Sequence, residues 1–326
     1  MEIIRLRYPF DSHSLVHASQ GKVMAVGHFD GVHLGHQDVI YRAVRQAAET
    51  GRLAAVMTFH PHPKEVLGHG RQYASALTPM EEKLQLFASI GVDLAYVVHF
   101  DETLAALSPE QFVQELLREL RVEEAVVGFD FTFGSRGAGT PETLQKLGGR
   151  DLSVTVIPPF VDQGIKVSSS RIREALLAGE VTAAKRLLGR PYRISGIVTH
   201  GEGRGRMIGF PTANIAQDAY YTLPKLGVYA VTAVLEDGSA CPAVMNLGVK
   251  PTFHDVPGEA KLEVHLFDYS GDLYGQRLAV DFESFLRPER KFSGVEQLVH
   301  QIKQDAEEAR TILAGLQPGS ITENGC

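Results

Sequence analysis

The 326-residue sequence contains no tryptophan and only two cysteines, Cys241 and Cys326. Two cysteines cannot form a disulfide framework or a cysteine-rich zinc site, and their scarcity is typical of a reducing compartment. No apolar run approaches the roughly 18–20 residues that a membrane-spanning helix needs. The N-terminal segment, MEIIRLRYPF, lacks the apolar core of a secretory signal peptide. We therefore expect a soluble, cytoplasmic protein that has no membrane partner.

The sequence also lacks an excess of positive charge. Lys and Arg number 32 against 39 Asp and Glu, which gives a net charge of −7. A protein that coats nucleic acid is usually basic or carries a basic stripe, and this sequence has neither feature. We expect no nucleic-acid partner, so any bound phosphates should belong to small molecules. The sequence carries no indication of oligomeric state.

A change of pattern near residue 188 predicts two domains, 1–187 and 188–326. In the first domain, apolar strand-like runs alternate with helix signals, as in a parallel sheet with helices on its faces. Helices are expected over Gly35–Thr50 and after proline-containing caps at Thr78, Ser108 and Thr140. The predicted strands are Lys22–Gly27, Leu53–Phe59, Val92–Phe100, Glu124–Phe129 and Ser153–Pro158. Ligands of such sheets bind beyond the carboxyl ends of the strands.

The second domain is rich in short β runs separated by glycine, proline and Asp-Gly turns, a pattern typical of a small antiparallel barrel. A long helix follows, from a capping box at Ser293 to about Gly315. The predicted strands are Tyr192–His200, Gly227–Glu236, Cys241–Asn246, Lys261–Asp268 and Gln276–Phe285. The predicted fold class is thus α/β, with a parallel-sheet domain before a small antiparallel β-barrel and its long terminal helix.

The first candidate site follows the first predicted strand. His33 and His36 flank a glycine where a helix begins, and the N–H groups and positive dipole of a helix start favour an anion. Gly31 and Gly35 let a phosphate approach the backbone closely. Imidazole N–H groups can then stabilise charge on a transferring phosphoryl group. The alternative interpretation is an ordinary helix start with two surface histidines.

A zinc site is another alternative, because His28, His60 and His62 also lie at the ends of predicted strands. No carboxylate or cysteine with metal-ligand spacing accompanies these histidines. We therefore favour phosphate binding over zinc binding at this edge of the sheet.

Four strings in the first domain resemble the nucleotidylyltransferase superfamily and its bacterial FAD synthetase branch. They are HLGH at His33–His36, TFHPHP at Thr58–Pro63, GFDFTFG at Gly128–Gly134 and VSSSRIR at Val167–Arg173. The resemblance implies a Rossmann-like nucleotidylyltransferase domain in which both histidines of the first string contact ATP phosphates.

The same resemblance implies roles for further residues. It assigns Arg173 to the β and γ phosphates of ATP, and a guanidinium is a bidentate phosphate donor. Ser170 replaces the usual Thr of the family string and keeps its hydroxyl, whereas His60 replaces a common Asp. The other implied contacts to the nucleotide are Gly27, Asp30, Asp130, Ser169 and Ser170. Phe59 and Phe131 are candidate contacts to the flavin, although aromatic residues beside strands more often belong to the core.

The second candidate site lies in the predicted barrel. A glycine-rich loop with Gly203 and Arg206 can wrap phosphates, although a plain hairpin loop is the alternative. Thr212 and Asn214 are two residues apart, so an extended chain directs both toward one face, where neutral oxygens suit Mg²⁺ bridged by ATP phosphates. Glu263 alternates with apolar neighbours; it is either a general base facing a cavity or a solvent-facing residue.

Several strings of the second domain together resemble riboflavin kinase. They are PTAN at Pro211–Asn214, GVY at Gly227–Tyr229, NLGVKPTF at Asn246–Phe253, EVHL at Glu263–Leu266 and FLR at Phe285–Arg287. The resemblance implies that Thr212 and Asn214 bind magnesium and ATP, that Glu263 is the base, and that Arg287 contacts the flavin. Both resemblances together imply a bifunctional riboflavin kinase/FMN adenylyltransferase, which makes FMN from riboflavin and FAD from FMN with ATP and Mg²⁺.

Two other functions compete with this hypothesis. The first is a single-activity enzyme that keeps one module only for binding or stability, and the intact motifs in both halves argue against it. The second is a flavin-sensing regulatory protein that binds nucleic acid, and the acidic net charge argues against that.

Overall fold

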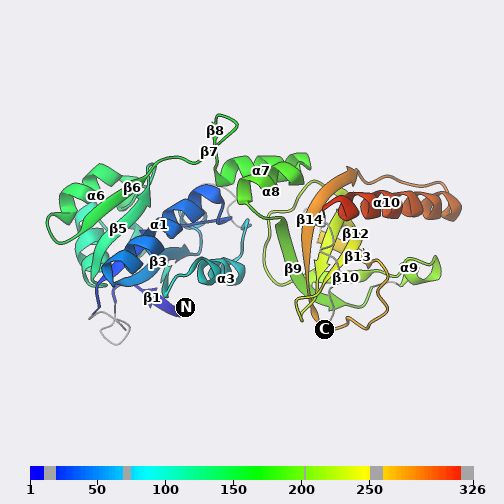
Figure 1. Ribbon diagram of the computed structural model, residues 1–326, viewed down its shortest axis with the longest axis horizontal. Helices are drawn as coiled ribbons and strands as arrows, with labels where there is room; N and C mark the ends of the chain where they lie inside the picture. Colours follow the sequence, from blue (N-terminus) through cyan, green and yellow to red (C-terminus); the bar gives the residue numbers. More distant parts are fainter. Residues whose placement is uncertain (11–19, 69–74, 202, 250–259, 317–326) are drawn as a thin grey trace, which may run out of the picture. The chain divides into compact units, whose positions relative to one another are not determined.

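The computed structural model of the chain describes residues 1–10, 20–68, 75–201, 203–249 and 260–316. Its contacts divide the chain into two compact units, Met1–Ser169 and Ser170–Cys326 (Figure 1). The first unit contains a parallel sheet, and the second contains a closed antiparallel barrel and the long helix α10 (Val295–Leu316). These features confirm the predicted fold class. None of the described helices is long and apolar enough to cross a membrane.

The sheet of the first unit has six strands, and every neighbouring pair is parallel. Their order is β1 (Glu2–Arg7), β4 (Leu94–His99), β3 (Leu53–His60), β2 (Lys22–Val26), β5 (Val122–Gly128) and β6 (Ser153–Ile157). From β2, the next strands along the chain, β3 and β4, are added on one side of β2, whereas β5 and β6 are added on its other side. Where the strand order reverses in this way, the loops after the two central strands diverge and leave a crevice for a ligand. The loops after β2 and β5 are therefore the expected walls of a site.

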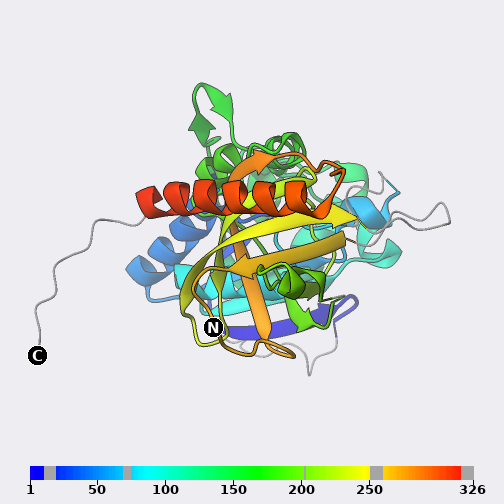
Figure 2. The same ribbon diagram turned by 90° about the vertical axis from the view of Figure 1, so that its right-hand side faces the viewer.

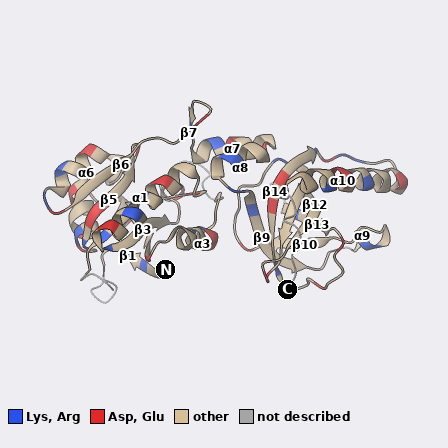
Figure 3. Cartoon of the chain, viewed as in Figure 1, with Lys and Arg blue, Asp and Glu red and all other residues tan. Residues whose placement is uncertain are grey.

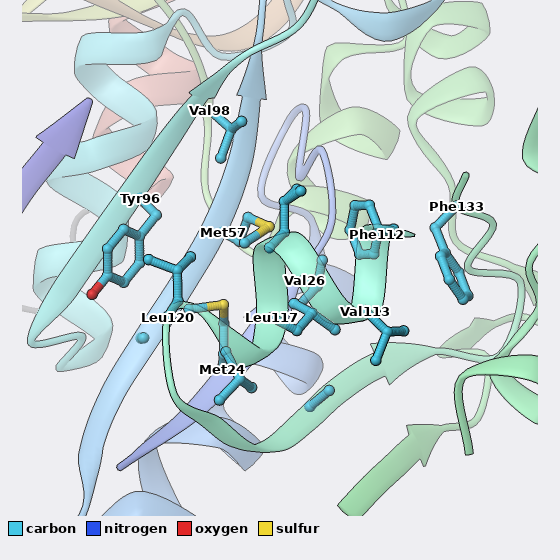
Figure 4. Packing of buried hydrophobic residues seen from close by; sticks show 14 of the residues in the cluster. Met24, Val26, Met57, Tyr96, Val98, Phe112, Val113, Leu117, Leu120 and Phe133 are labelled. Carbon is cyan, nitrogen blue, oxygen red and sulfur yellow. The ribbon is translucent and has the colours of Figure 1, made fainter. Parts of the chain in front are cut away.

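Helices cover both faces of this sheet. On one face, α1 (Leu34–Thr50) and α3 (Met80–Ile90) pack against Val23 and Ala25 of β2. On the other face, the π-helix η3 (Phe112–Arg118) packs against Met24 and Val26 (Figure 4). Alternate residues of β2 thus enter two different cores, which explains why this strand is apolar throughout. The shorter elements are α2 (Pro63–Val66), α4 (Glu102–Ala105), α5 (Pro109–Gln111), η4 (Ser135–Gly137), α6 (Pro141–Gly148) and the hairpin of β7 (Val161–Asp162) and β8 (Ile165–Lys166).

Two of the three helix caps predicted in the first domain are present. Ser108 forms a complete capping box with Gln111, and Thr140 accepts the amide hydrogen of Thr143. The third prediction is wrong, because α3 begins at Met80 with Pro79 at the N-cap position and has no side-chain cap. The amide of Thr78 instead donates to the carboxylate of Asp30, so a tertiary contact replaces the local one.

The second unit begins with two helices, α7 (Ser169–Ala178) and α8 (Val181–Leu188), so the division of the chain falls in the first turn of α7. Helix α8 packs on the barrel, where Lys185 Nζ lies 2.6 Å from Glu283 Oε2. The barrel strands, in spatial order, are β10 (Ala213–Gln217), β13 (Ala260–Leu266), β12 (Ala240–Val249), β11 (Gly227–Val234), β14 (Arg277–Arg287) and β9 (Tyr192–Thr199). Five of these match the predicted runs, and β10 was not predicted.

Helix α10 lies across the strands of the barrel (Figure 2). Ala306, Ala309 and Leu313 form an apolar cluster with barrel residues that include Val228 and Phe267. The remainder of the helix surface carries both signs of charge (Figure 3). The sequence and the packing agree here, because a helix with one apolar face needs one partner surface.

An ion pair adds a directional contact between α10 and the barrel. Arg287 at the end of β14 donates from Nε and Nη2 to the carboxylate of Asp305, at 2.9 and 2.7 Å. The Arg287 side chain is 18% exposed and that of Asp305 is 5% exposed. Removing one partner of such a pair leaves a charge with poor solvation, which is costly.

We predict that Asp305→Asn lowers the free energy of unfolding by about 2–3 kcal/mol, because Arg287 then lacks its counter-charge. Urea unfolding followed by far-UV circular dichroism measures this change. Asp268→Asn is the matched control, because Asp268 pairs with Arg310 at the surface and its backbone φ of 57° suits asparagine. Equal stability of Asp305→Asn and the wild type would show that the pair does not hold α10.

Candidate active sites

The loop Gly27–His33, which follows β2, is held in place by side chains from other parts of the first unit. The carbonyl oxygen of His28 accepts hydrogen bonds from Thr58 Oγ1 and from Lys83 Nζ, both at 2.9 Å. The carbonyl of Asp30 accepts from Ser169 Oγ at 2.8 Å. Because these donors come from β3, α3 and the last residue of the unit, the loop conformation depends on the tertiary fold.

The same loop contains strained backbone. Phe29 and Val32 have φ values of 55° and 41°, in the left-handed region that β-branched and bulky residues rarely adopt. Both side chains are buried, and this packing offsets the strain. Gly27, a predicted nucleotide contact, has no room for a side chain, since a Cβ atom would lie 2.9 Å from the Phe29 ring. Strain of this kind concentrates at functional sites, where the surrounding structure maintains it.

His33 and His36 meet at the start of α1. His33 is the N-cap residue, and its Nδ1 accepts the amide hydrogen of His36 at 3.2 Å. The two rings stack with their centroids 3.6 Å apart. Burial lowers the pKa of His33 to about 4. The ring is therefore neutral at pH 7, and because Nδ1 accepts a hydrogen bond, the proton resides on Nε2.

Asp130 and Lys166 form an ion pair at the neighbouring strand end. Asp130 follows β5, and its Oδ2 lies 2.5 Å from Lys166 Nζ of β8. The Lys166 ammonium also lies 4.5 Å from the centroid of the Phe129 ring. Both charges influence the pKa of His33, which the Lys166 charge lowers and the Asp130 charge raises. The loops after β2 and β5 and the strand β8 thus bring His33, Asp130 and Lys166 into one region.

The structure places the other predicted residues of this site in different settings. The Asp30 carboxylate accepts from the amides of Leu77 and Thr78, so it holds the chain that leads into α3. Phe59 is part of the apolar core, and Phe131 stacks on Phe133 with centroids 5.6 Å apart. Ser170 and Arg173 follow Ser169 on α7, in the second unit. Ligand contacts of all these residues stay predictions.

Two histidines of the alternative zinc interpretation lie side by side. The rings of His28 and His62 contact each other, with centroids 3.9 Å apart. Across the described ranges of the chain, however, no group of three or more His, Cys, Asp or Glu residues is arranged to hold a metal ion.

A cleft of about 120 Å³ in the barrel gathers five predicted residues. Glu263 of β13 is paired across the sheet with Asn214 of β10 on one side and Asn246 of β12 on the other. Paired residues on antiparallel strands share a face, so this register directs Asn214 and Glu263 toward the same cleft. The residues that line it are Gly201, Gly203, Gly205, Arg206, Pro211, Thr212, Asn214, Lys261, Glu263 and Tyr274.

The segment that carries Thr212 and Asn214 is fixed by close contacts. A Cβ atom on Gly201 would lie 2.2 Å from Asn214 Nδ2, so the asparagine side chain lies directly over this glycine. His265 Nδ1 lies 2.7 Å from the carbonyl oxygen of Pro211, to which it donates a hydrogen bond. The first contact positions the Asn214 side chain, and the second positions the backbone directly before Thr212.

Lys261 is a site residue that the sequence interpretation missed. Its Nζ lies 2.9 Å from Glu263 Oε1. The sequence did contain a signal for Lys261, because residues two apart on a strand share a face and Glu263 was already a candidate.

Arg287, a predicted flavin contact, lies instead in the ion pair with Asp305, and its role toward a flavin stays a prediction. A larger cavity of about 520 Å³ at the start of α10 is lined by Arg290, Lys291, Phe292, Glu296, Gln297 and His300.

We predict that the neutral state of His33 makes the stability of the protein depend on pH. In the unfolded chain, His33 takes up a proton near its ordinary pKa of 6.5, whereas the folded value is about 4. The unfolded state therefore binds more protons between these values, and stability falls as the pH falls from 7 to 5, by about 2 kcal/mol. His33→Asn, which keeps an N-cap acceptor, should lack this component. Urea unfolding at both pH values measures the difference, and an equal loss in both proteins would contradict the assignment.

Comparison with known proteins identifies both halves of the chain. The family model for FAD synthetase matches residues 15–171, and that for riboflavin kinase matches residues 188–313. A crystal structure from Streptococcus pneumoniae, described as a macrolide-efflux protein, has a TM-score of 0.83 and 32% sequence identity. That match covers 94% of this chain and 99% of the other.

Two curated relatives carry the same name, bifunctional riboflavin kinase/FMN adenylyltransferase. The protein from Bacillus subtilis (strain 168) is 44% identical over 320 residues, which cover 97% of this chain and 100% of the relative. The protein from Escherichia coli (strain K12) is 37% identical over 309 residues, covering 94% and 97%. With an FAD synthetase module before a riboflavin kinase module, the chain belongs to the bifunctional riboflavin kinase/FMN adenylyltransferase family.

Proposed function

We propose that the barrel phosphorylates riboflavin to FMN and that the parallel-sheet unit adenylylates FMN to FAD, with ATP as the donor in both reactions. Family membership supports the pair of activities. The observation that carries our assignment of residues is the single cleft that contains Thr212, Asn214 and Glu263.

We also propose a module boundary near residue 188, between the two matched ranges. We further propose a cytoplasmic location, which the scarcity of cysteine supports.

In the proposed kinase step, the ribityl 5′-hydroxyl attacks the γ-phosphorus of ATP. Glu263 accepts the hydroxyl proton as the new P–O bond forms and the bond to ADP breaks. Lys261 keeps the Glu263 carboxylate oriented within the cleft. Thr212 and Asn214 have neutral oxygens that fit a Mg²⁺ ion with phosphate ligands, and such an ion, when bound, neutralises phosphate charge.

In the proposed adenylyl step, a phosphate oxygen of FMN attacks the α-phosphorus of ATP, and pyrophosphate leaves. The FMN phosphate is already ionised near neutral pH, so this step needs no general base. The Nε2–H of neutral His33 donates in a fixed direction, because its Nδ1 is held by the amide of His36. We assign His36, Ser170 and Arg173 to the remaining phosphate oxygens, in accord with the motif order of the family. Ser169, whose hydroxyl donates to the carbonyl of Asp30, holds the loop that carries His33.

We predict that single substitutions separate the two activities. With riboflavin, ATP and Mg²⁺, the wild type should form FMN and then FAD. His36→Ala should accumulate FMN, with FAD formation reduced about 100-fold, because a donor to the transferring phosphoryl group is lost. Glu263→Ala should form no FMN but should convert added FMN to FAD at the wild-type rate. Chromatography of the flavins measures each product.

Glu236→Ala, which removes an exposed carboxylate in the turn between β11 and β12, is the control and should match the wild type. The reverse pattern of products would contradict our assignment of sites to reactions. Formation of FMN without FAD by the wild type would favour a single-activity enzyme. Unchanged rates in excess EDTA would contradict the proposed Mg²⁺.

A further inference from the structure

Lys83 is a buried lysine that neither proposed reaction uses. It lies on α3 beside the buried residues Leu84 and Phe87, and only 3% of it is exposed. Its Nζ reaches the loop after β2, where it donates to the carbonyl oxygen of His28 at 2.9 Å. Burying an ammonium group is costly unless it is bonded and its charge is balanced. Because this burial costs free energy, we expect Lys83 to have a role at the loop that offsets the cost.

The hydrogen bond alone does not explain the lysine. The same carbonyl oxygen already accepts a hydrogen bond from Thr58 Oγ1 at 2.9 Å, and the side chain of Thr58 is fully buried. One neutral donor satisfies a buried carbonyl group. What Lys83 adds is a second bond that carries a positive charge.

Two ionisable groups on neighbouring elements interact electrostatically with this ammonium group. The buried carboxylate of Asp30 acts from the loop and raises the pKa of Lys83. His60, at the end of β3, has a lowered pKa, to which the charge of Lys83 contributes after burial. Burial lowers the pKa of Lys83 to about 8, so the group still carries its charge at pH 7.

We propose that Lys83 is a positioning residue for adenylyl transfer, which fixes the His28–Asp30 segment and places a positive charge behind the phosphate-binding loop. The inference rests on the proposed function of the first unit. Lys83 acts through the planar peptide between His28 and Phe29, whose C=O and N–H point in opposite directions. A cation on the carbonyl side polarises that peptide and strengthens the N–H on the other side as a donor to an anion.

Two variants separate the charge from the hydrogen bond. Lys83→Met and Thr58→Val each remove one donor to the same carbonyl oxygen, and only the first removes a charge. For FAD formation from FMN and ATP at pH 7, we expect kcat/KM for ATP to fall about 10- to 100-fold in Lys83→Met and about threefold in Thr58→Val. Riboflavin kinase activity of the same preparations should be unchanged in both. Equal losses in the two variants, or no loss in Lys83→Met, would overturn the proposal.

A pH profile gives a readout that a purely structural tether would not change. In the wild type and in Thr58→Val, kcat/KM for FAD formation should fall above about pH 8, as Lys83 loses its proton. Lys83→Met should lack this alkaline limb, and a retained limb would assign it to another group and overturn the proposal. If Lys83→Met does not fold, Lys83→Gln makes the same comparison with a neutral donor. Absence of FAD with the wild type contradicts the proposed function, whereas a wild-type rate in Lys83→Met contradicts only this inference.

Discussion

The hydrogen bond from the amide of His36 to Nδ1 of His33 determines what the first site can offer a ligand. Because this nitrogen accepts, His33 is held in one tautomer, with its remaining proton on Nε2. Burial keeps the ring neutral, and stacking on His36 keeps its plane fixed. The ring is thus a directed neutral donor and not a mobile cation. A directed donor needs no reorganisation when charge develops on a phosphoryl oxygen.

The second site is organised by strand register and not by a helix start. Asn214 and Glu263 are brought together because β10 and β13 pair with these residues opposite each other. A shift of the register by one residue would turn the carboxylate to the other face of the barrel. The contacts of Gly201 with Asn214 and of His265 with Pro211 also hold this arrangement. The two modules therefore prepare their sites by different means, one through a strained loop and one through a sheet.

The sequence was sufficient to predict elements with strong periodicity or full burial, such as β2, α1 and α10. It did not reveal β1, a short edge strand in which Glu2, Arg5 and Arg7 interrupt the apolar pattern, or β10, which is only partly buried. For the barrel site, alternation predicted the directions of Thr212, Asn214 and Glu263, but their meeting in one cleft depends on long-range pairing. Lys83 shares its helix face with Leu84 and Phe87, and this pattern indicates in the sequence that the lysine is buried. The sequence does not indicate its partner, which is a backbone carbonyl 55 residues away.

The pairing of β1 determines when the backbone of this strand can form its hydrogen bonds during synthesis. This strand, Glu2–Arg7, is synthesised long before its parallel partner β4, which begins at Leu94. Until then, its backbone amides and carbonyls have no sheet to join, and an unpaired strand is a template for association between chains. The three charged residues that obscure β1 in the sequence also discourage such association. The barrel, being closed, leaves no comparable edge once it has formed.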